Sequence, residues 1–370
     1  MTNFSKGNCI LAAVFLVSSM PLLCAAAAQP TTDPGIPTGY LADAAVGLRT
    51  LQTWYVRKTG LWRTTGWWNG ANAVTVLVDY SKLSGSSKFR GEVENTFKRN
   101  SKGKFVNKFF DDEGWWALAW IDAYEWSHDA RYLDMAREIF ADMTTGWNET
   151  CGGGIWWSKD RHYKNAIANE LFLSVAANLA SRSGDAREQS IYVSWVKREW
   201  GWFSRSGMIN SQNLVNDGLD ADCRNNGKTV WSYNQGVILG GLARAFQETQ
   251  DQGLLQQAQS IAQATLKHLA DGNGILHDAC EPDCGADGVQ FKGIFVRNLA
   301  TLNSVAPQKQ YETFLQTNAE SIWNRDQGPN YEFGLIWSGP FNSANAASQI
   351  SALDSFLAAE SSKGPTRLGE

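Results

Sequence analysis

The sequence contains no long run of lysine or arginine, and its 33 basic and 37 acidic residues leave a formal net charge of −4. Because nothing resembles a phosphate-binding stripe, we do not expect a nucleic-acid partner. Past the N-terminal region, no segment approaches the roughly 20 uninterrupted apolar residues of a membrane-spanning helix. The 4 histidines are scattered without the spacing of a metal site. We therefore expect a soluble protein that needs no membrane, metal or organic cofactor.

β-Strand signals are also nearly absent, since alternating runs of valine, isoleucine and threonine are rare. The chain instead repeats pairs of helical segments at a spacing of roughly 50 residues. One member of each pair is apolar on most faces, whereas the other is amphipathic with a period of about 3.6 residues. We interpret the apolar members as inner helices, at Asn72 to Leu83, Glu113 to Trp126, Asn165 to Ala180, Trp231 to Gln247, Val289 to Leu302 and Ser343 to Leu357. The amphipathic members are predicted outer helices, at Tyr40 to Arg57, Lys88 to Arg99, Ala130 to Thr144, Ala186 to Phe203, Gly253 to Leu269 and Lys309 to Asn324.

The alternation of these segments predicts the architecture. Inner and outer helices that follow one another in this way indicate an all-α domain over residues 38–360, an (α/α)6 barrel built as a toroid of six helical hairpins. In such a barrel, the loops that enter the inner helices converge on one end. Residues just before the inner helices are therefore expected to share one cleft, although they are far apart in the sequence.

The flanking segments have a different composition. Lys6, the apolar residues 10–23 and the small residues 24–28 follow the order of a signal peptide, so we predict cleavage near Ala28 and secretion. Residues 29–37, rich in proline and threonine, are predicted to be a short extended leader, and 361–370 a flexible C-terminal tail. The last residues lack the hydrophobic tail of a glycolipid anchor signal, so no anchor is expected. The sequence does not specify an oligomeric state, and our expectation is a monomer.

An even number of cysteines, Cys151, Cys223, Cys280 and Cys284, remains after the predicted signal peptide. In an oxidising compartment they predict two disulfide bonds. Cys280 and Cys284 flank a short Glu-Pro-Asp loop, which favours pairing them and leaves Cys151 for Cys223, although four cysteines allow three connectivities. Zinc binding is a weaker alternative because matching ligands are missing. Asn148 begins an Asn-Glu-Thr sequon and is a candidate glycosylation site.

Two adjacent aspartates, Asp111 and Asp112, stand at the mouth of the second predicted inner helix. One of them could cap the helix while the other complements its dipole, since acidic residues are common at helix starts. The aromatic pairs on either side, Phe109-Phe110 and Trp115-Trp116, favour a catalytic interpretation. Aromatic surroundings can raise the pKa of one carboxyl while its neighbour stays ionised.

The segment Asp111-Asp-Glu-Gly-Trp-Trp-Ala-Leu-Ala-Trp-Ile-Asp-Ala-Tyr124 strongly resembles the signature of glycoside hydrolase family 76, the endo-α-1,6-mannanases and their fungal cell-wall relatives. Further similar segments are Trp67-Trp-Asn-Gly-Ala-Asn72, Gly153-Gly-Ile-Trp-Trp157, Lys164-Asn-Ala-Ile-Ala-Asn-Glu170, Trp231-Ser-Tyr-Asn-Gln-Gly236 and Phe291-Lys-Gly-Ile-Phe-Val-Arg297. The resemblance thus covers nearly the whole chain after the predicted signal peptide. The six-hairpin barrel of this family agrees with the helix pattern.

The resemblance implies an enzyme that cleaves α-1,6-linked mannan or mannooligosaccharides and retains the anomeric configuration. Asp111 would be the nucleophile and Asp112 the general acid and base, while Glu113 is interpreted as a first-turn helix residue. Retaining enzymes place their two carboxyl groups about 5 to 5.5 Å apart, and inverting enzymes about 6.5 to 9.5 Å. Adjacency in the sequence favours the shorter separation.

Candidate substrate-binding residues lie near the predicted inner-helix entrances. Tryptophans that could stack on sugar rings, or could simply be buried in the core, are Trp68, Trp116, Trp157 and Trp231. Polar candidates are Asn69, Asn72, Asp217, Tyr233, Lys292 and Arg297. For the asparagines helix capping is an equal alternative. Asp217 resembles a substrate-contacting position of the family, with turn chemistry as the alternative. For the two cations the alternative is a structural ion pair.

Three other functions stay open at this point. A transglycosidase of the same fold would pass the mannosyl intermediate to another sugar instead of water. A non-catalytic carbohydrate-binding wall protein would use the aspartates only as caps. A terpenoid cyclase also has a helical barrel and aspartate-rich helices, but it would need a second acidic cluster and a basic set for magnesium diphosphate, which we do not find.

Overall fold

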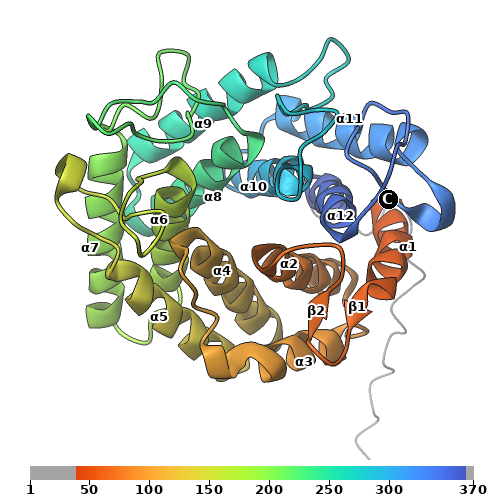
Figure 1. The fold of residues 1–370 in the computed structure, drawn as a ribbon, viewed down its shortest axis with the longest axis horizontal. Helices are drawn as coiled ribbons and strands as arrows, with labels where there is room; N and C mark the ends of the chain where they lie inside the picture. The colour runs from red at the N-terminus through yellow and green to blue at the C-terminus, as the bar shows by residue number, and fades with distance from the viewer. Residues whose placement is uncertain (1–38, 364–370) are drawn as a thin grey trace, which may run out of the picture. The chain divides into compact units, whose positions relative to one another are not determined.

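The computed structural model describes residues 39–363, and over that range the chain folds into twelve α-helices arranged as two concentric rings (Figure 1). The inner ring consists of α2 (Trp67–Ser84), α4 (Phe110–Ser127), α6 (Ala166–Ala180), α8 (Ser232–Thr249), α10 (Phe291–Val305) and α12 (Ala346–Ser361). The outer ring consists of α1 (Tyr40–Thr53), α3 (Arg90–Asn100), α5 (Ala130–Thr144), α7 (Ala186–Phe203), α9 (Gln252–His268) and α11 (Lys309–Arg325). Inner and outer helices alternate along the chain, as the sequence predicted.

The inner helices close into a complete ring. Each packs against the next inner helix in the sequence, and α12 packs against α2. The predicted (α/α)6 barrel is therefore confirmed. All of these helices belong to one compact unit of the chain.

Burial explains why the two kinds of helix differ in composition. In α6 every residue except Asn178 is buried, because inner helices are enclosed by the outer ring and by their inner neighbours. In the outer helix α5 only one stripe is buried, including Leu133, Ala136 and Phe140. Gly293 shows how tightly the inner ring packs, because a Cβ atom there would lie 2.5 Å from the Cα atom of Ser351 on α12.

One predicted helix is shorter than expected. The sequence pattern extended the first outer helix to Arg57, but α1 ends at Thr53 and is followed by a small hairpin of β1 (Tyr55–Val56) and β2 (Leu61–Trp62). The rings of Tyr55 and Trp62 pack across this hairpin with centroids 4.8 Å apart. This aromatic pair gives the segment a tertiary partner that helix periodicity does not reveal.

Short 3-10 turns complete the described structure: η1 (Ser101–Gly103), η2 (Thr150–Gly152), η3 (Gly288–Gln290) and η4 (Pro329–Tyr331). The predicted signal peptide, 1–28, and leader, 29–37, lie outside the described residues. Of the predicted tail, Ser361 ends α12 and the next two residues form a turn, while 364–370 lie outside the description. Within residues 39–363, no helix is both long enough and apolar enough to cross a membrane.

Candidate active site

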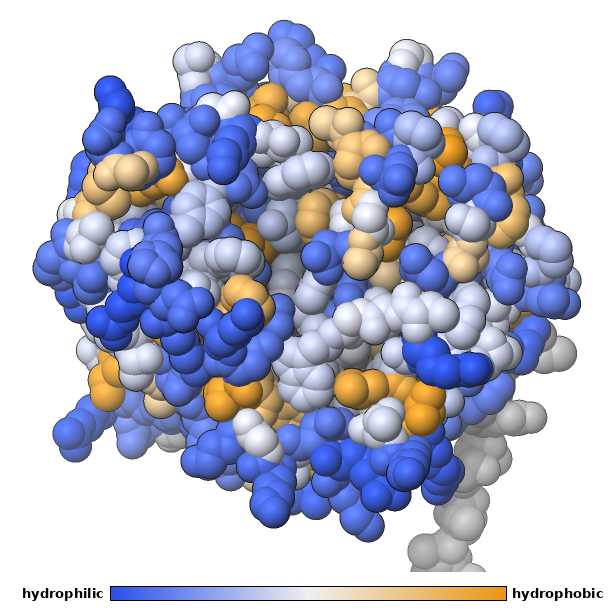
Figure 2. Space-filling view, in the orientation of Figure 1, coloured by the Kyte–Doolittle hydropathy of each residue, from blue (hydrophilic) through white to orange (hydrophobic). Residues whose placement is uncertain are grey.

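A cleft of about 520 Å³ opens at the end of the barrel where the inner helices begin. This volume lies in the range typical of ligand sites. The same face of the molecule is hollowed near its centre in Figure 2. The lining residues all stand at the start of an inner helix or in the loop before it: Trp68, Phe109, Asp111, Asp112, Trp115, Trp157, Tyr163, Asn165, Asp217, Tyr233, Asp287 and Phe291. The expected convergence of these loops is therefore confirmed.

Asp111 and Asp112 occupy the first turn of α4, where the helix dipole favours negative charge. Each carboxyl accepts one hydrogen bond from a neutral side chain of a neighbouring loop. Asp111 Oδ2 accepts from Nε1 of Trp157 at 3.0 Å, and Asp112 Oδ2 accepts from Nδ2 of Asn107 at 2.5 Å. Two adjacent carboxyl groups are thus presented to one cleft, each held from its own side.

Burial opposes ionisation of both groups. It raises the pKa of Asp111 to about 7, with a further contribution from Asp112, while the Trp157 hydrogen bond acts in the opposite direction. Burial raises the pKa of Asp112 to about 6, which Asn107 lowers and the charge of Asp287 raises. Both pKa values thus lie close to neutrality, and because the two carboxyls interact, they lose their protons in steps that belong to the pair. An acid and a carboxylate are then available at the same pH.

A third carboxyl of the cleft, that of Asp217, is held by Tyr163. The Tyr163 hydroxyl donates to Asp217 Oδ2 at 2.5 Å and accepts from Nδ2 of Asn226 at 2.9 Å. A Cβ atom at Gly218 would lie 2.5 Å from that hydroxyl oxygen, so only glycine lets the two loops meet this closely. Asp217 therefore faces the cleft in a fixed position.

Aromatic rings form the walls on both sides of the carboxyls. On one side, Tyr233 and Phe291 stack with centroids 3.8 Å apart, and Trp68 packs on Trp115 at 5.6 Å. Trp68 also donates from Nε1 to Asp287 Oδ1 at 2.8 Å. On the other side, Phe109 packs on Trp157 at 4.8 Å. Flat aromatic faces beside hydrogen-bond acceptors suit a ligand with apolar ring faces and hydroxyl edges.

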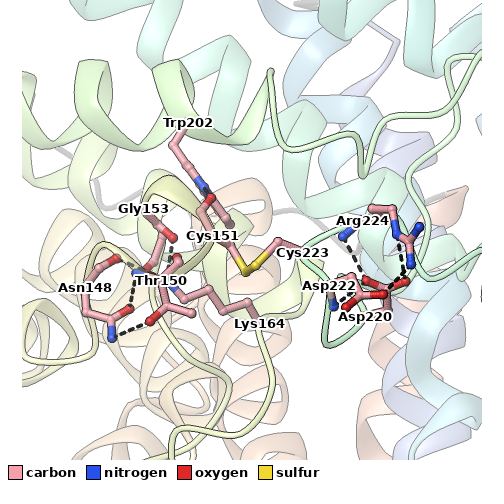
Figure 3. The surroundings of a disulfide bond; sticks show 11 residues. Asn148, Thr150, Cys151, Gly153, Lys164, Trp202, Asp220, Asp222, Cys223 and Arg224 are labelled. Carbon is pink, nitrogen blue, oxygen red and sulfur yellow. Dashed lines mark hydrogen bonds and ion pairs between the residues drawn. A yellow bond between two sulfur atoms is a disulfide. The ribbon is translucent and has the colours of Figure 1, made fainter.

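The Cys151–Cys223 disulfide joins the two loops that carry Trp157 and Asp217 (Figure 3). Below it, the buried Nζ of Lys164 donates to the carbonyls of Asn148 at 3.1 Å, Thr150 at 2.7 Å and Gly154 at 2.9 Å, and contacts that of Gly153. This burial lowers the pKa of Lys164 to about 8. A disulfide bond and the hydrogen bonds of Lys164 thus hold the loops of the cleft wall in place.

The second disulfide joins Cys280 to Cys284, so both bonds have the pairing expected from the sequence. Asn148, the candidate glycosylation site, lies in the loop between α5 and η2, and its Nδ2 donates to Thr150 Oγ1 at 3.2 Å. Glycosylation itself stays a prediction.

Six of the residues predicted from the sequence meet in the cleft: Asp111, Asp112, Trp68, Trp157, Asp217 and Tyr233. Glu113 is fully buried and pairs with Lys159 at 2.9 Å instead of lining the cleft, as its interpretation as a helix residue implied.

Two predicted tryptophans lie elsewhere. Trp116 is fully buried and packs on Phe105 with centroids 4.8 Å apart, so it is not a cleft wall. Successive helical residues point about 100° apart, which turns Trp115 toward the cleft and Trp116 toward the outer layer. Trp231 precedes α8 and does not line the cleft, and its ring packs on Phe291 in a T-shaped arrangement with centroids 5.6 Å apart.

The predicted asparagines and cations are engaged in structural contacts. Asn69 is buried and accepts from the Gly66 N–H at 2.9 Å, which caps α2. Asn72 accepts from Arg297 at 2.6 Å, and Arg297 also pairs with Asp354 at 2.9 Å. Asn72 and Arg297 line a second cavity further along the inner helices. These three residues therefore do not contact the cleft.

Lys292 is also a structural residue. It is fully buried and its Nζ contacts Glu281 Oε1 at 2.5 Å and the Leu335 carbonyl at 2.7 Å. A buried charge needs such partners, so the ion-pair alternative holds for Lys292 as it does for Arg297.

Sequence reasoning placed Phe109 and Trp115 beside the acidic pair without naming them as substrate-binding residues, and it missed Tyr163, Asn165, Asp287 and Phe291. All of these residues could have been predicted to line the cleft, because each stands close to a predicted inner-helix start. Asn107, which holds Asp112 from behind, gave no signal of its own. Within residues 39–363, no group of histidine, cysteine and acidic side chains is arranged to hold a metal ion.

A closed helical barrel with two adjacent carboxyls in an aromatic cleft places the protein among the helical-barrel glycosidases. The sequence profile of glycosyl hydrolase family 76 matches residues 43–368, so the chain belongs to this family.

Curated relatives are fungal. The mannan endo-1,6-alpha-mannosidase DCW1 of Candida albicans is 28% identical over 66% of this chain and 60% of the relative. A putative mannan endo-1,6-alpha-mannosidase of Schizosaccharomyces pombe is 25% identical over 82% of this chain and 76% of the relative. The chain thus spans about three fifths of the length of the Candida albicans protein.

Solved structures share the fold. An inactive variant of the α-1,6-mannanase GH76A of a Salegentibacter species, with two consecutive aspartates replaced and α-1,6-mannotriose bound, aligns with a TM-score of 0.77 at 22% identity, over 87% of this chain and 99% of that one. Dfg5 from Chaetomium thermophilum in complex with glucosamine aligns with a TM-score of 0.80 at 21% identity, over 89% of this chain and 92% of that one.

Proposed function

We propose that this protein is a secreted, endo-acting α-1,6-mannanase that hydrolyses mannan or cell-wall glycans by a retaining double displacement. The observation that carries the proposal is the pair Asp111 and Asp112, which shares an aromatic cleft where burial raises the pKa of both carboxyls. Family membership supports a glycosidase. The names of the fungal relatives and the mannotriose bound to the Salegentibacter enzyme support the α-1,6-mannoside.

The proposed reaction has two steps. In the first, Asp111 attacks the anomeric carbon while Asp112 gives its proton to the glycosidic oxygen, so the leaving sugar departs as an alcohol and a mannosyl ester forms on Asp111. In the second, Asp112 takes a proton from water, the oxygen attacks the anomeric carbon and the ester bond breaks. The reaction requires the proton on Asp112 when substrate binds, whereas burial raises the pKa of Asp111 further than that of Asp112, so substrate binding must shift the proton to Asp112.

The rest of the cleft would position the sugars. Stacking faces come from Trp68, Trp157 and Tyr233, and the fixed carboxyl of Asp217 accepts hydrogen bonds from hydroxyl groups. No basic residue lines the cleft among the described residues, which suits an uncharged glycan.

Secretion and glycosylation belong to the same proposal. Two disulfide bonds support an oxidising compartment. N-terminal sequencing of the exported protein should begin just after Ala28. Glycosidase treatment should increase the gel mobility of the wild type but not of Asn148→Gln.

The decisive experiment incubates wild type, Asp111→Asn, Asp112→Asn and the exposed-loop control Asp160→Asn with linear α-1,6-mannan and its oligosaccharides. We expect shorter products with initial α configuration by NMR from wild type and control only. Initial β products would refute retention, and longer products would indicate a transglycosidase. If no mannoside is consumed, the catalytic proposal fails and a binding protein becomes the better interpretation.

A further inference from the structure

We propose that Asn107 is a positioning residue that holds Asp112 by one oxygen and directs its acidic proton to the other. This inference rests on the proposed role of Asp112 as general acid and base. Asn107 stands in the loop before α4 and is half-buried behind the cleft, which it does not line. It therefore acts on the substrate only through Asp112.

The orientation of the Asn107 amide is fixed by two opposite contacts. Its Oδ1 accepts from the Phe109 N–H at 2.7 Å, and its Nδ2 donates to Asp112 Oδ2 at 2.5 Å. Turning the amide over would set NH2 against the Phe109 N–H and oxygen against the carboxylate. Both contacts would then be repulsive, so the NH2 group must face Asp112.

The loop that carries Asn107 is tied to a polar network around the buried Glu113 of α4. The Asn107 N–H donates to Glu113 Oε1 at 3.3 Å. Glu113 Oε1 lies 2.9 Å from Lys159 Nζ, which also lies 2.7 Å from Asp142. The fully buried Glu113 thereby anchors the positioning residue instead of acting on the substrate.

The donor decides which oxygen of Asp112 can be protonated. An amide NH2 can donate but cannot accept, and a carbonyl oxygen is a better acceptor than the O–H oxygen of a carboxylic acid, so this contact favours an unprotonated Oδ2. The proton of the neutral acid is therefore placed on Oδ1. The arrangement presents one defined oxygen for proton transfer to the leaving sugar and for its return from water.

The same hydrogen bond favours the ionised form of Asp112, which lowers its pKa against the effect of burial. Other titratable groups share the cleft with it: Asp111 on α4, Asp217 and Tyr163 from two loops, Tyr233 on α8, and Asp287 before α10. Of these, the charge of Asp287 raises the pKa of Asp112. Asn107 is thus an uncharged donor that partly offsets the rise in the pKa of Asp112 caused by burial and by Asp287.

Asn107→Asp is the strongest perturbation, because an aspartate keeps the oxygen that accepts from Phe109, loses the donor and adds a negative charge beside Asp112. We expect the basic limb of the pH profile of kcat/KM, which reports the general acid, to move upward by about one pH unit. Asn107→Ser has a hydroxyl too short to reach Asp112 and should move the limb in the same direction by less. The control is Asn100→Asp on the outer helix α3, where Nδ2 donates only to the carbonyls of Thr59 and Thr96; it should leave the profile unchanged.

A basic limb that stays in place in both active Asn107 variants would overturn the inference, even if their stability falls. Should wild type itself cleave no mannoside, the proposed function fails while the inference is still tested by NMR titration of 13C-labelled aspartate carboxyls. The Asp112 signal, assigned by its loss in Asp112→Asn, should then titrate at higher pH in Asn107→Asp. An unchanged titration would refute the inference independently of activity.

Discussion

Replacing Asp111 by asparagine should make the protein more stable above neutral pH, although we expect it to abolish catalysis. Burial and the neighbouring Asp112 raise the pKa of Asp111 from 3.8 to about 7 in the folded chain. A raised pKa means that the folded state binds the proton more tightly than the unfolded state. The stability from this carboxyl is therefore fully present below about pH 4 and is lost as pH rises to about 7.

The size of the effect follows from the shift. A difference of about three units corresponds to about 4 kcal/mol at 1.36 kcal/mol per unit. Because the carboxyl borders an open cleft, solvent screens part of this penalty, and we expect a gain of about 2 kcal/mol. Asparagine can still accept from Trp157 Nε1, so the loop contact is kept. Active-site groups often lower the stability of the folded protein, so replacing them can raise its free energy of unfolding.

Urea unfolding between pH 5 and 8.5 measures this prediction. The free energy of unfolding of Asp111→Asn should exceed that of wild type by an amount that grows with pH and levels off above about pH 7. The exposed control Asp160→Asn should stay within about 0.5 kcal/mol of wild type at every pH. A difference between Asp111→Asn and wild type that does not depend on pH, or a less stable variant at pH 8.5, would refute the reasoning.

Other changes test the supports of the site. Lys292→Met should lower the free energy of unfolding by about 3 kcal/mol, because the largely buried Glu281 would keep only His277 as an ion-pair partner; urea unfolding within about 1 kcal/mol of wild type would contradict this. Removing the Cys151–Cys223 disulfide, with its sequence separation of 72, should cost about 4 kcal/mol through the entropy of the unfolded chain. Thermal unfolding of the double serine variant checks that cost, and an unchanged midpoint would count against it. Trp157→Phe keeps an aromatic ring but loses the indole donor, so kcat/KM on mannan should fall on the order of tenfold, and unaltered kinetics would show that the hydrogen bond has no catalytic effect.

The architecture could be predicted because it depends on local periodicity. Inner helices are apolar all round since they are enclosed on every side, and outer helices are amphipathic since one side meets water. The alternation of inner and outer helices predicts a barrel, and in such a barrel the loops before the inner helices lie at one end. Asp111 and Asp112 could be located in the same way, because a helix start is a local feature.

What failed was the assignment of individual side chains near those starts. Trp115 and Trp116 are neighbours in the sequence, but the rotation of α4 about its axis turns one to the cleft and the other into the core. Only contacts with other helices determine that rotation. The partner of Arg297 was not visible because it is Asp354, 57 residues away in the sequence.

The sequence by itself therefore determined the order of the helices, the end of the barrel that carries the cleft and the position of the acidic pair, since each follows from patterns within a few turns of chain. Tertiary structure decided which side chains face the cleft and which close its walls. Hydrogen-bond partners such as Asn107 for Asp112 and Tyr163 for Asp217 are set by how separate loops meet. Those loops meet only when the ring of inner helices has closed.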